Sequence, residues 1–311
     1  MKSLLSVCAA ALLSIGSAAW ALPPAGEAPQ STLMEATKGP SQVIIWKAMD
    51  EDTTVYMMGT VHILNPNIQW KNETFEGAWA EAETVYFEAD ILSPDAAQAA
   101  APLIMSLGFD QQGKKLADYY SGDEQVTINE AIGGFGMSIE TFQNMRPWLA
   151  GIQTAQVALQ SIGGSAEGGV EMILGKRAME EGKALRFFET VSEQLEMLAS
   201  ADDEAQAKVF LDGMPDLKNV EGYFADLVGA WYQGENEKLA DMISAGVSAA
   251  PEVADVLLYD RNEKWAAEIA KVMADEPGTI FIAVGAGHLG GERSVQDYLA
   301  EAGISTVRVG E

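Results

Sequence analysis

The sequence predicts an α/β protein with a central mixed β-sheet, flanking helices and a large helical insertion. Short apolar runs typical of buried strands gather at the two ends of the chain, and the middle has the spacing of amphipathic helices. Both histidines of the chain stand in one frame, in which an apolar strand is followed by Gly-x-x-His. Loops beyond the carboxyl ends of strands hold the ligands of open α/β sheets, so this frame also predicts a site.

The amino-terminal residues 1–21 have the features of a secretory signal peptide. Lys2 is the positive end, Leu4–Ile15 is an apolar stretch too short for a comfortable membrane span, and Ala19–Ala21 has the small-x-small cleavage pattern. The one cysteine, Cys8, lies inside this segment, so a mature chain would have neither a disulfide nor a thiolate ligand. We therefore expect a periplasmic or secreted protein.

The rest of the chain suits a single domain at residues 43–311, preceded by an extended leader at residues 22–42 that is rich in Pro, Gly and Ala. The formal net charge of -27 disfavours nucleic acids and anionic membranes, and a solvated surface is its simplest explanation. No later apolar run has the roughly 18 residues of a transmembrane helix. We expect a peptide or small-molecule substrate, and the sequence leaves the oligomeric state open.

The amino-terminal part of the domain predicts a β-hairpin, a helix and a third strand. The hairpin turn is the acidic run at residues 50–52, and Asn72 is a suitable N-cap for the helix. The third strand leads directly into Glu88. The three predicted strands are Val43–Ala48, Thr54–Met58 and Thr84–Phe87.

Helical spacing dominates residues 93–182 and 190–274, which we predict to be insertions between strands. Between these blocks, residues 183–188 predict a strand that ends at Glu189, and Thr190–Glu193 is a capping box for the next helix. Two strands near the carboxyl terminus complete the sheet. These are Thr279–Val284, which precedes the second Gly-x-x-His frame, and Ile304–Val309.

Four predicted strand ends carry a candidate metal ligand, namely His62, Glu88, Glu189 and His288. Two neutral imidazoles with one or two carboxylates suit Mn, Fe, Co or Zn better than an ion held only by oxygen. A bound ion would lower the pKa of a coordinated water, and a second carboxylate would take the proton. The glycine before each histidine allows a tight turn and a close approach to a ligand.

Each candidate also has a structural explanation. Glu88 could be an acidic residue at an exposed strand end, and Glu189 and Glu171 are both favourable near the amino end of a helix. Arg146 and Arg261 are candidates for orienting a substrate carboxylate or carbonyl, although a structural ion pair is the simpler explanation of each.

Other chemistries have little support in the sequence. The chain has no G-x-S-x-G elbow and no P-loop. Gly285, Gly287 and Gly290 fit a dinucleotide fingerprint formally, but they lie too near the carboxyl terminus for a βαβ unit.

Several segments together resemble the TraB/GumN family, which is related to the Tiki metalloproteases. The resemblance covers residues 43–309, and the family's two G-x-x-H motifs and its glutamate fall here on Gly59–His62, Gly285–His288 and Glu88. The segments that carry it are IIWKAMDEDTTVYMMGTVHIL, VYFEAD, RPW, GGVEMILGKRAMEEGKALRFFETVSEQL, DRNEKWAAEIAKVM and FIAVGAGHLGG.

The resemblance implies a fold similar to the erythromycin-esterase and ChaN-like α/β proteins and, for the Tiki branch, Mn- or Co-dependent peptide hydrolysis. We therefore expect a divalent-metal-dependent hydrolase, in the first place a peptidase, with Mn or Co favoured and Zn or Fe as alternatives. The resemblance also implies that Glu171, Glu189, Arg261 and Asn262 match recurring positions. The expected roles are metal binding by His62, Glu88 and His288, proton transfer by Glu189 or Glu171, oxyanion or substrate stabilisation by Arg261, and substrate binding by Arg146 and Asn262.

Two other functions are compatible with the same residues. A non-catalytic protein would sequester a peptide signal or haem in the cleft and retain it without turnover. A degenerate domain with only a folding role would show no rise in melting temperature with any divalent ion, because a ligand that binds only the folded state must raise it.

Overall fold

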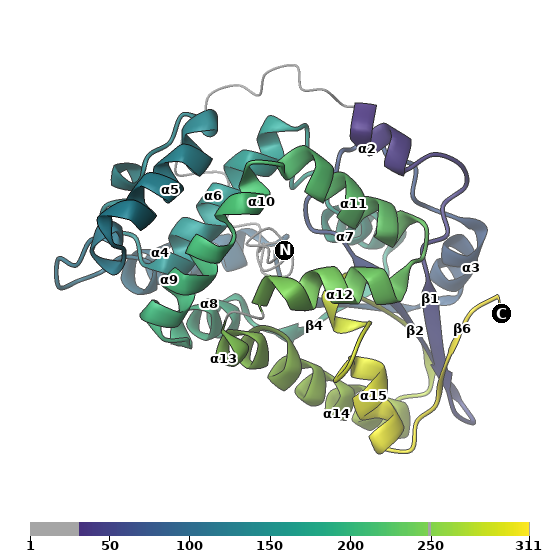
Figure 1. Cartoon of the computed structure of the whole chain (residues 1–311). Helices are drawn as coiled ribbons and strands as arrows, with labels where there is room; N and C mark the ends of the chain where they lie inside the picture. The colour runs from purple at the N-terminus through teal and green to yellow at the C-terminus, as the bar shows by residue number, and fades with distance from the viewer. Residues whose placement is uncertain (1–30, 248–249, 311) are drawn as a thin grey trace.

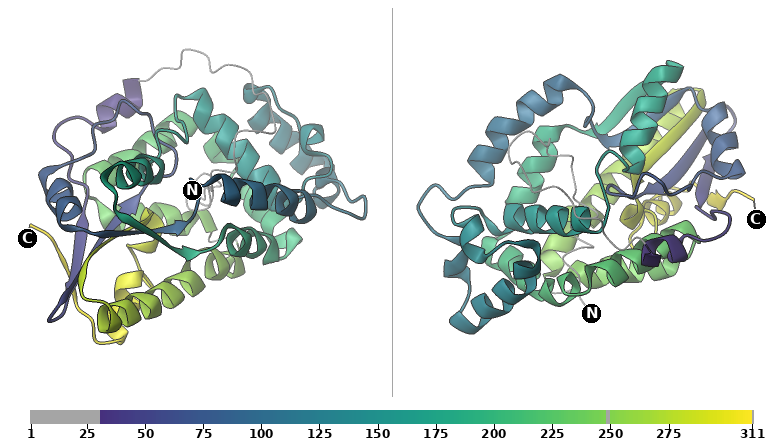
Figure 2. Two further views of the ribbon diagram at one scale, coloured as in Figure 1. Left: turned by 180° about the vertical axis from the view of Figure 1, so that it is seen from behind. Right: turned by 90° about the horizontal axis from the view of Figure 1, so that it is seen from above.

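The computed structural model describes residues 31–247 and 250–310 (Figure 1). The predicted signal peptide and the first part of the predicted leader lie outside these residues. A six-stranded mixed sheet has helices packed on both faces (Figure 2), which confirms the predicted α/β class. Within the two described ranges, every helix is too short or too polar to cross a membrane.

The strand order in the sheet is β4-β3-β5-β2-β1-β6. The predicted hairpin is confirmed, because β1 and β2 pair antiparallel with Ile45 opposite Met58. The neighbouring strands β2, β5, β3 and β4 all run parallel, and β6 is antiparallel to β1. The strands are β1 (Ile45–Met49), β2 (Thr53–Thr60), β3 (Thr84–Ala89), β4 (Ala184–Glu189), β5 (Gly278–Gly285) and β6 (Thr306–Arg308).

The parallel register decides which loops meet. Thr60 at the end of β2 pairs with Gly285 at the end of β5, so the two Gly-x-x-His segments leave the sheet side by side. Ala89 pairs with Glu189 in the same way at the ends of β3 and β4. Glu88 lies within β3, one residue before its end, because the strand is longer than the predicted Thr84–Phe87.

Most helices fall in the two predicted insertions, with α4 to α7 between β3 and β4 and α8 to α14 between β4 and β5, whereas α2, α3 and α15 lie outside them. Asn72 caps α3 by accepting the Phe75 amide, and Thr190 with Glu193 forms the predicted capping box. The helices are α2 (Ser31–Ala36), α3 (Glu73–Glu81), α4 (Pro94–Leu107), α5 (Gly122–Ile132), α6 (Pro147–Ser161), α7 (Val170–Glu181), α8 (Val191–Ser200), α9 (Asp203–Asp212), α10 (Met214–Leu217), α11 (Val220–Tyr232), α12 (Asn236–Val247), α13 (Pro251–Ala254), α14 (Asp260–Asp275) and α15 (Val295–Glu301). Shorter turns are η1 (Leu116–Tyr119), η2 (Gly133–Phe135), η3 (Ile139–Phe142), the π-helical η4 (Asp255–Tyr259) and η5 (Ala286–His288).

The leader at residues 22–42 is not extended throughout, because it contains the helix α2. α2 packs on α11, where Leu33 is buried and the Thr32 hydroxyl donates to Glu221. A Pro- and Gly-rich composition carries no signal of this packing, since the apolar surface that Leu33 covers belongs to a helix far along the chain.

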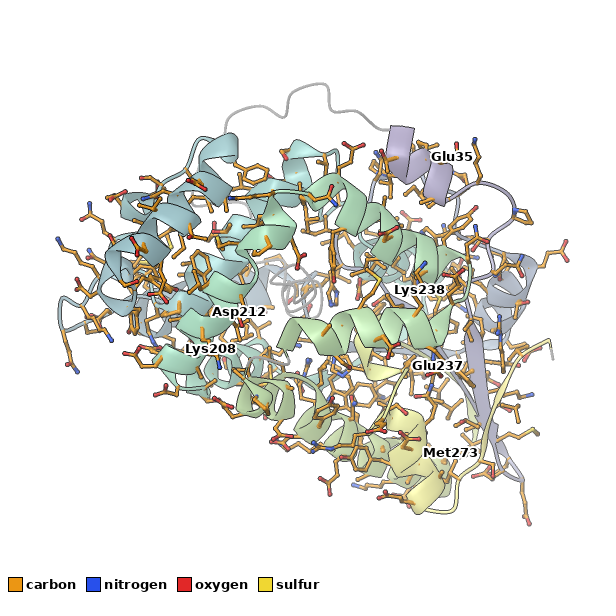
Figure 3. All side chains as sticks on the ribbon, viewed as in Figure 1. Glu35, Lys208, Asp212, Glu237, Lys238 and Met273 are labelled. Atoms are coloured by element: carbon orange, nitrogen blue, oxygen red, sulfur yellow. The ribbon has the colours of Figure 1, made fainter. Side chains whose placement is uncertain are left out.

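The core has two parts, one on each face of the sheet. Phe281 in β5 packs edge-on against Phe75 and Trp79 on one face, and Ile280 and Ile282 belong to the other. A strand buried on both faces has a continuous apolar sequence, which is why β5 is so evident in the sequence. The charged side chains lie mainly outside, as Glu35, Lys208, Glu237 and Lys238 do in Figure 3, in keeping with a solvated acidic surface.

We predict that Gly59→Ala destabilises the fold by about 1–3 kcal/mol, because a β-carbon on Gly59 would lie 2.9 Å from Ala286 Cα, where backbone must move. The control is Gly77→Ala on the exposed side of α3, where a β-carbon meets nothing within 4 Å. Gly77→Ala should stabilise by roughly 0.5–1 kcal/mol, since alanine favours a helix interior. Urea unfolding measures both, and equal stability of Gly59→Ala and the wild type would contradict the close approach of the two segments.

Candidate functional site

Polar side chains from six elements gather at the carboxyl edge of the parallel strands. Most of them are buried, and each has at least one partner from another element. They are His62 after β2, Glu88 in β3, Glu171 at the start of α7, Glu189 at the end of β4, Arg261 and Asn262 in α14, and His288 in η5. Every predicted site residue except Arg146 is in this group.

The imidazole of His62 is held by the carboxylate of Glu171. Nδ1 of His62 lies 2.6 Å from Glu171 Oε1, and the Thr60 hydroxyl donates to the same oxygen. Nδ1 therefore donates its hydrogen to Glu171, whereas the buried Nε2 has no partner in the described part of the chain. Burial by itself lowers the pKa of His62, but the charge and hydrogen bond of Glu171, aided by Glu88, raise it to about 9.

The glycines before α7 allow this contact. A β-carbon on Gly169 would overlap the carbonyl oxygen of His62, and the Val170 amide donates to Val61 at 3.0 Å. The run around Gly168 and Gly169 is thus a close-packed junction that brings Glu171 to the histidine.

Glu88 is a buried carboxylate with donors on both oxygens. The Gly285 amide donates to Oε1 at 2.6 Å, and Arg261 Nη2 donates to Oε2 at 2.5 Å. Burial favours the protonated acid, but the positive charge of Arg261, the two histidines and the Gly285 amide lower the pKa to about 2. Glu88 is therefore ionised near neutral pH.

Arg261 is the centre of the polar network. Its Nε and Nη2 donate to the two oxygens of Glu189 at 2.8 and 2.9 Å, and Nη1 donates to the Leu257 carbonyl at 3.1 Å. The same Nη1 lies 3.2 Å from Nε2 of His288, and the guanidinium lies 4.5 Å from the Trp265 ring centre. Burial lowers the pKa of the guanidinium, but Glu88 and Glu189 more than offset this and raise it.

The ring of His288 is oriented by Asn262. Asn262 Nδ2 donates to the Arg293 carbonyl at 2.8 Å, so its Oδ1 faces Nδ1 of His288 at 2.6 Å and accepts the ring hydrogen. Nε2 of His288 is then an acceptor, 3.7 Å from Glu88 Oε1. Burial lowers the pKa of His288 to about 3. Arg293 has a φ of 58°, which is uncommon for a residue other than glycine and aims its carbonyl at Asn262.

A π-helical turn, η4, directly precedes α14 and its site residues. Such a turn inserts a residue into the helix and recurs at functional sites. Its Leu257 carbonyl accepts from the side chain of Arg261, so the irregular turn helps to hold the guanidinium toward the sheet.

The ligand-type side chains converge on Gly285 at the end of β5. A β-carbon at this position would lie 3.1 Å from Glu88 Oε1, 3.2 Å from His62 Nε2 and 3.6 Å from His288 Cδ2. One carboxylate and both imidazoles therefore face the same point beside the end of β5.

Comparison with known proteins identifies the family. A model of the TraB/PrgY/gumN family matches residues 44–308. The chain belongs to the TraB/PrgY/gumN family. This confirms the family resemblance of the sequence. The chain is also 22% identical to the uncharacterized protein YbaP of Escherichia coli (strain K12), over 82% of this chain and 92% of that protein. It is 22% identical to the uncharacterized protein YbaP of Shigella flexneri, over 78% and 87%. No solved structure matched the chain.

A metal ion is the cofactor that the sequence predicts for this chain, and its expected ligands are of residue types that suit Mn, Fe, Co or Zn. Within residues 31–247 and 250–310, no three His, Asp or Glu side chains are grouped closely enough to hold an ion as they stand. Arg261 contacts Glu88 Oε2 and His288 Nε2, two of the atoms that an ion would need. The fit rests on the unpartnered His62 Nε2 and on the space beside Gly285. Both rings are also anchored at Nδ1 by oxygen, as metal-bound histidines are.

Arg146 lies elsewhere in this TraB/PrgY/gumN structure, which corrects its predicted place in the substrate site. Its Nε donates to Asp203, and its other nitrogens donate to the carbonyls of Leu107 and Ala199, each at 2.9 Å. No contact among the described residues joins it to the histidines. The structural ion pair is its simplest explanation, and it ties α4, α8 and α9 together.

Two site residues were missed by the sequence reasoning. Gln194 in α8 is 3% exposed, its Nε2 lies 3.5 Å from Glu88 Oε2, and its Oε1 is buried without a partner among the described residues. Trp265 is buried, and it also donates to Glu189 at 3.2 Å and packs on the His288 ring. The capping box next to Gln194 marks the start of α8, but it carries no sign of the contact with Glu88.

We predict that the pKa values of the two histidines are shifted in opposite directions in the metal-free protein. The pKa of His62 should be about 9, and that of His288 about 3. The raised pKa of His62 stabilises the fold below its ordinary 6.5, and this contribution is lost as the pH rises through 9. The lowered pKa of His288 stabilises the fold above 6.5, and this is lost as the pH falls through 3. Nitrogen NMR of the two rings, assigned with His62→Gln, measures this, and two titrations near 6.5 would contradict it.

Proposed function

We propose that this chain is a divalent-metal-dependent hydrolase that acts on peptides outside the cytoplasm. The observation that carries the proposal is the arrangement around Gly285, where Glu88 and both imidazoles face one space. Membership of the TraB/PrgY/gumN family supports it through the resemblance to peptide-hydrolysing relatives. The predicted signal peptide supports a periplasmic or secreted location.

His62, Glu88 and His288 are the residues that would hold the ion. Two imidazole nitrogens and a carboxylate suit Mn, Fe, Co or Zn. The resemblance to the Tiki metalloproteases favours Mn or Co among these, with Zn or Fe as alternatives. When bound, such an ion polarises the substrate carbonyl and makes hydroxide available from water near neutral pH. Arg261 binds Glu88 through one oxygen and Glu189 through both, so it lies in the site beside the residues that would hold the ion.

The surrounding residues orient these groups. Glu171 and Asn262 accept the Nδ1 hydrogens of His62 and His288, so both Nε2 atoms lie on the inner side of the site. Nε2 of His288 is an acceptor, and Nε2 of His62 would lose its proton on binding an ion. Arg261 provides a fixed positive charge for an oxyanion, because two carboxylates hold it in place.

Glu171 is the better candidate than Glu189 for the proton acceptor. Its Oε2 is buried and has no partner in the described ranges, so a proton can be received there. Both oxygens of Glu189 accept from Arg261, and one also accepts from Trp265. Glu189 is thus better suited to positioning the guanidinium.

Burial of the site favours a second candidate function, non-catalytic retention of a bound peptide. His288 is fully buried, and the side chain of His62 is only 11% exposed. A protein of this kind would bind a peptide and an ion without cleaving the chain.

We predict that Mn or Co raises the melting temperature of chelator-stripped mature protein and restores peptide cleavage. Glu88→Gln should lower metal affinity and cleavage by more than roughly 100-fold, because the amide is a poor ligand and no longer pairs with Arg261. The matched control is Glu167→Gln, the same chemical change at an exposed position, which should retain both properties. Elemental analysis, thermal unfolding and a peptide-library digest measure the outcomes.

The results separate the candidates. Bound metal with a peptide that is retained uncut would support the sequestering function. A melting temperature that no divalent ion changes, with normal cleavage by His62→Ala and His288→Ala, would rule out the metal-dependent hydrolase.

A further inference from the structure

The strand β4 forms one edge of the sheet, and no described strand lies beyond it (Figure 2). Its one strand partner is β3, with which it runs parallel. None of its residues is fully buried, whereas all but the first residue of β3 are. The side of β4 that faces away from β3 is therefore open, and this strand ends at Glu189.

The backbone groups of β4 alternate between β3 and the open side. The Ala184 amide donates to the Glu83 carbonyl at 3.0 Å, so Ala184 faces β3. Successive strand residues turn their N–H and C=O groups to opposite sides, so those of Leu185 and Phe187 face away from the sheet. Among the described residues, β3 is the one strand paired with β4, so the outward backbone groups of these two residues have no strand partner.

We infer that the free edge of β4 docks the substrate, an extended peptide segment that adds to the sheet as a further strand. Main-chain donors and acceptors that recur at every second residue are matched by another extended main chain. The strand also leads directly into Glu189, which binds Arg261 in the candidate site. The inference deepens the proposed hydrolase function, because it specifies how a peptide would be held.

A foreign peptide suits this edge better than a second copy of the chain. Each copy has a formal net charge of -27, so two copies repel each other. β4 is also short and has the exposed Arg186 in its middle, features that limit pairing between folded sheets.

The strand order sets the distance between docking and cleavage. β5, which leads to His288, is two places from β4 in the sheet. With strands about 4.8 Å apart, an added strand would lie roughly 14 Å from β5, a distance that about four extended residues cover. The docked segment should therefore begin about four residues from the bond that is cleaved, and its sequence should matter little.

The first test compares Leu185→Pro with Leu185→Ala. Both variants lose the leucine side chain, but proline alone removes the outward N–H, without taking a hydrogen bond from the β3 ladder. With a peptide of about a dozen residues, KM of Leu185→Pro should be roughly fivefold above that of Leu185→Ala at similar kcat. A peptide too short to reach β4 should show no difference. Equal KM values of the two variants for the long peptide would overturn the docking role.

The second test does not depend on hydrolysis. Hydrogen exchange followed by NMR is measured on the metal-stripped wild-type protein, with a random mixture of acetylated peptides of about a dozen residues. The amides of Leu185 and Phe187 should gain protection, whereas Arg186, bonded to β3, and the opposite edge strand β6 should not change. Protection without cleavage after metal loading would keep the docking edge and reject the hydrolase. Cleavage without protection, or protection that rises with protein concentration alone, would overturn the docking edge.

Discussion

The buried guanidinium of Arg261 is the interaction on which the candidate site depends. It joins α14 to β3 and β4 through Glu88 and Glu189, and it contacts His288. Removing three charges from water is costly, and only short, directed hydrogen bonds to both carboxylates offset that cost. Trp265 below the guanidinium and the Leu257 carbonyl complete its surroundings. The position of Arg261 thus sets the orientation of Glu88 and Glu189, two carboxylates that come from different strands.

The same network gives the two histidines opposite properties. His62 has an ionised carboxylate at its Nδ1, so its charged form is favoured despite burial. His288 has the neutral amide of Asn262 at the equivalent atom, so burial dominates and the ring stays uncharged. Pairs of titratable groups whose surroundings separate their pKa values are characteristic of acid–base sites. The candidate site has this property before any cofactor is considered.

Much of the fold was predictable because its signals are local. The run at Thr279–Val284 identified β5, which is buried on both faces, and Asn72 and Thr190 marked helix starts through their own hydrogen bonds. The helix α2 was not predictable, because Leu33 packs on α11 and nothing within the leader indicates that surface. The length of β3 was also missed, and this placed Glu88 inside the strand.

The sequence by itself determined the candidate site residues, because both histidines follow an apolar strand and a glycine in the same Gly-x-x-His frame. The sequence also indicated a role for the glycine of each frame, Gly59 and Gly285, because a glycine lets another segment approach the backbone closely. Only the tertiary structure decided that Thr60 pairs with Gly285, that Glu171 rather than Glu189 meets His62, and that Arg146 belongs to a helix junction. It also placed Gln194 beside Glu88. The physical reason is that contacts between distant segments follow from strand order and helix packing, and these depend on the surfaces of the whole core.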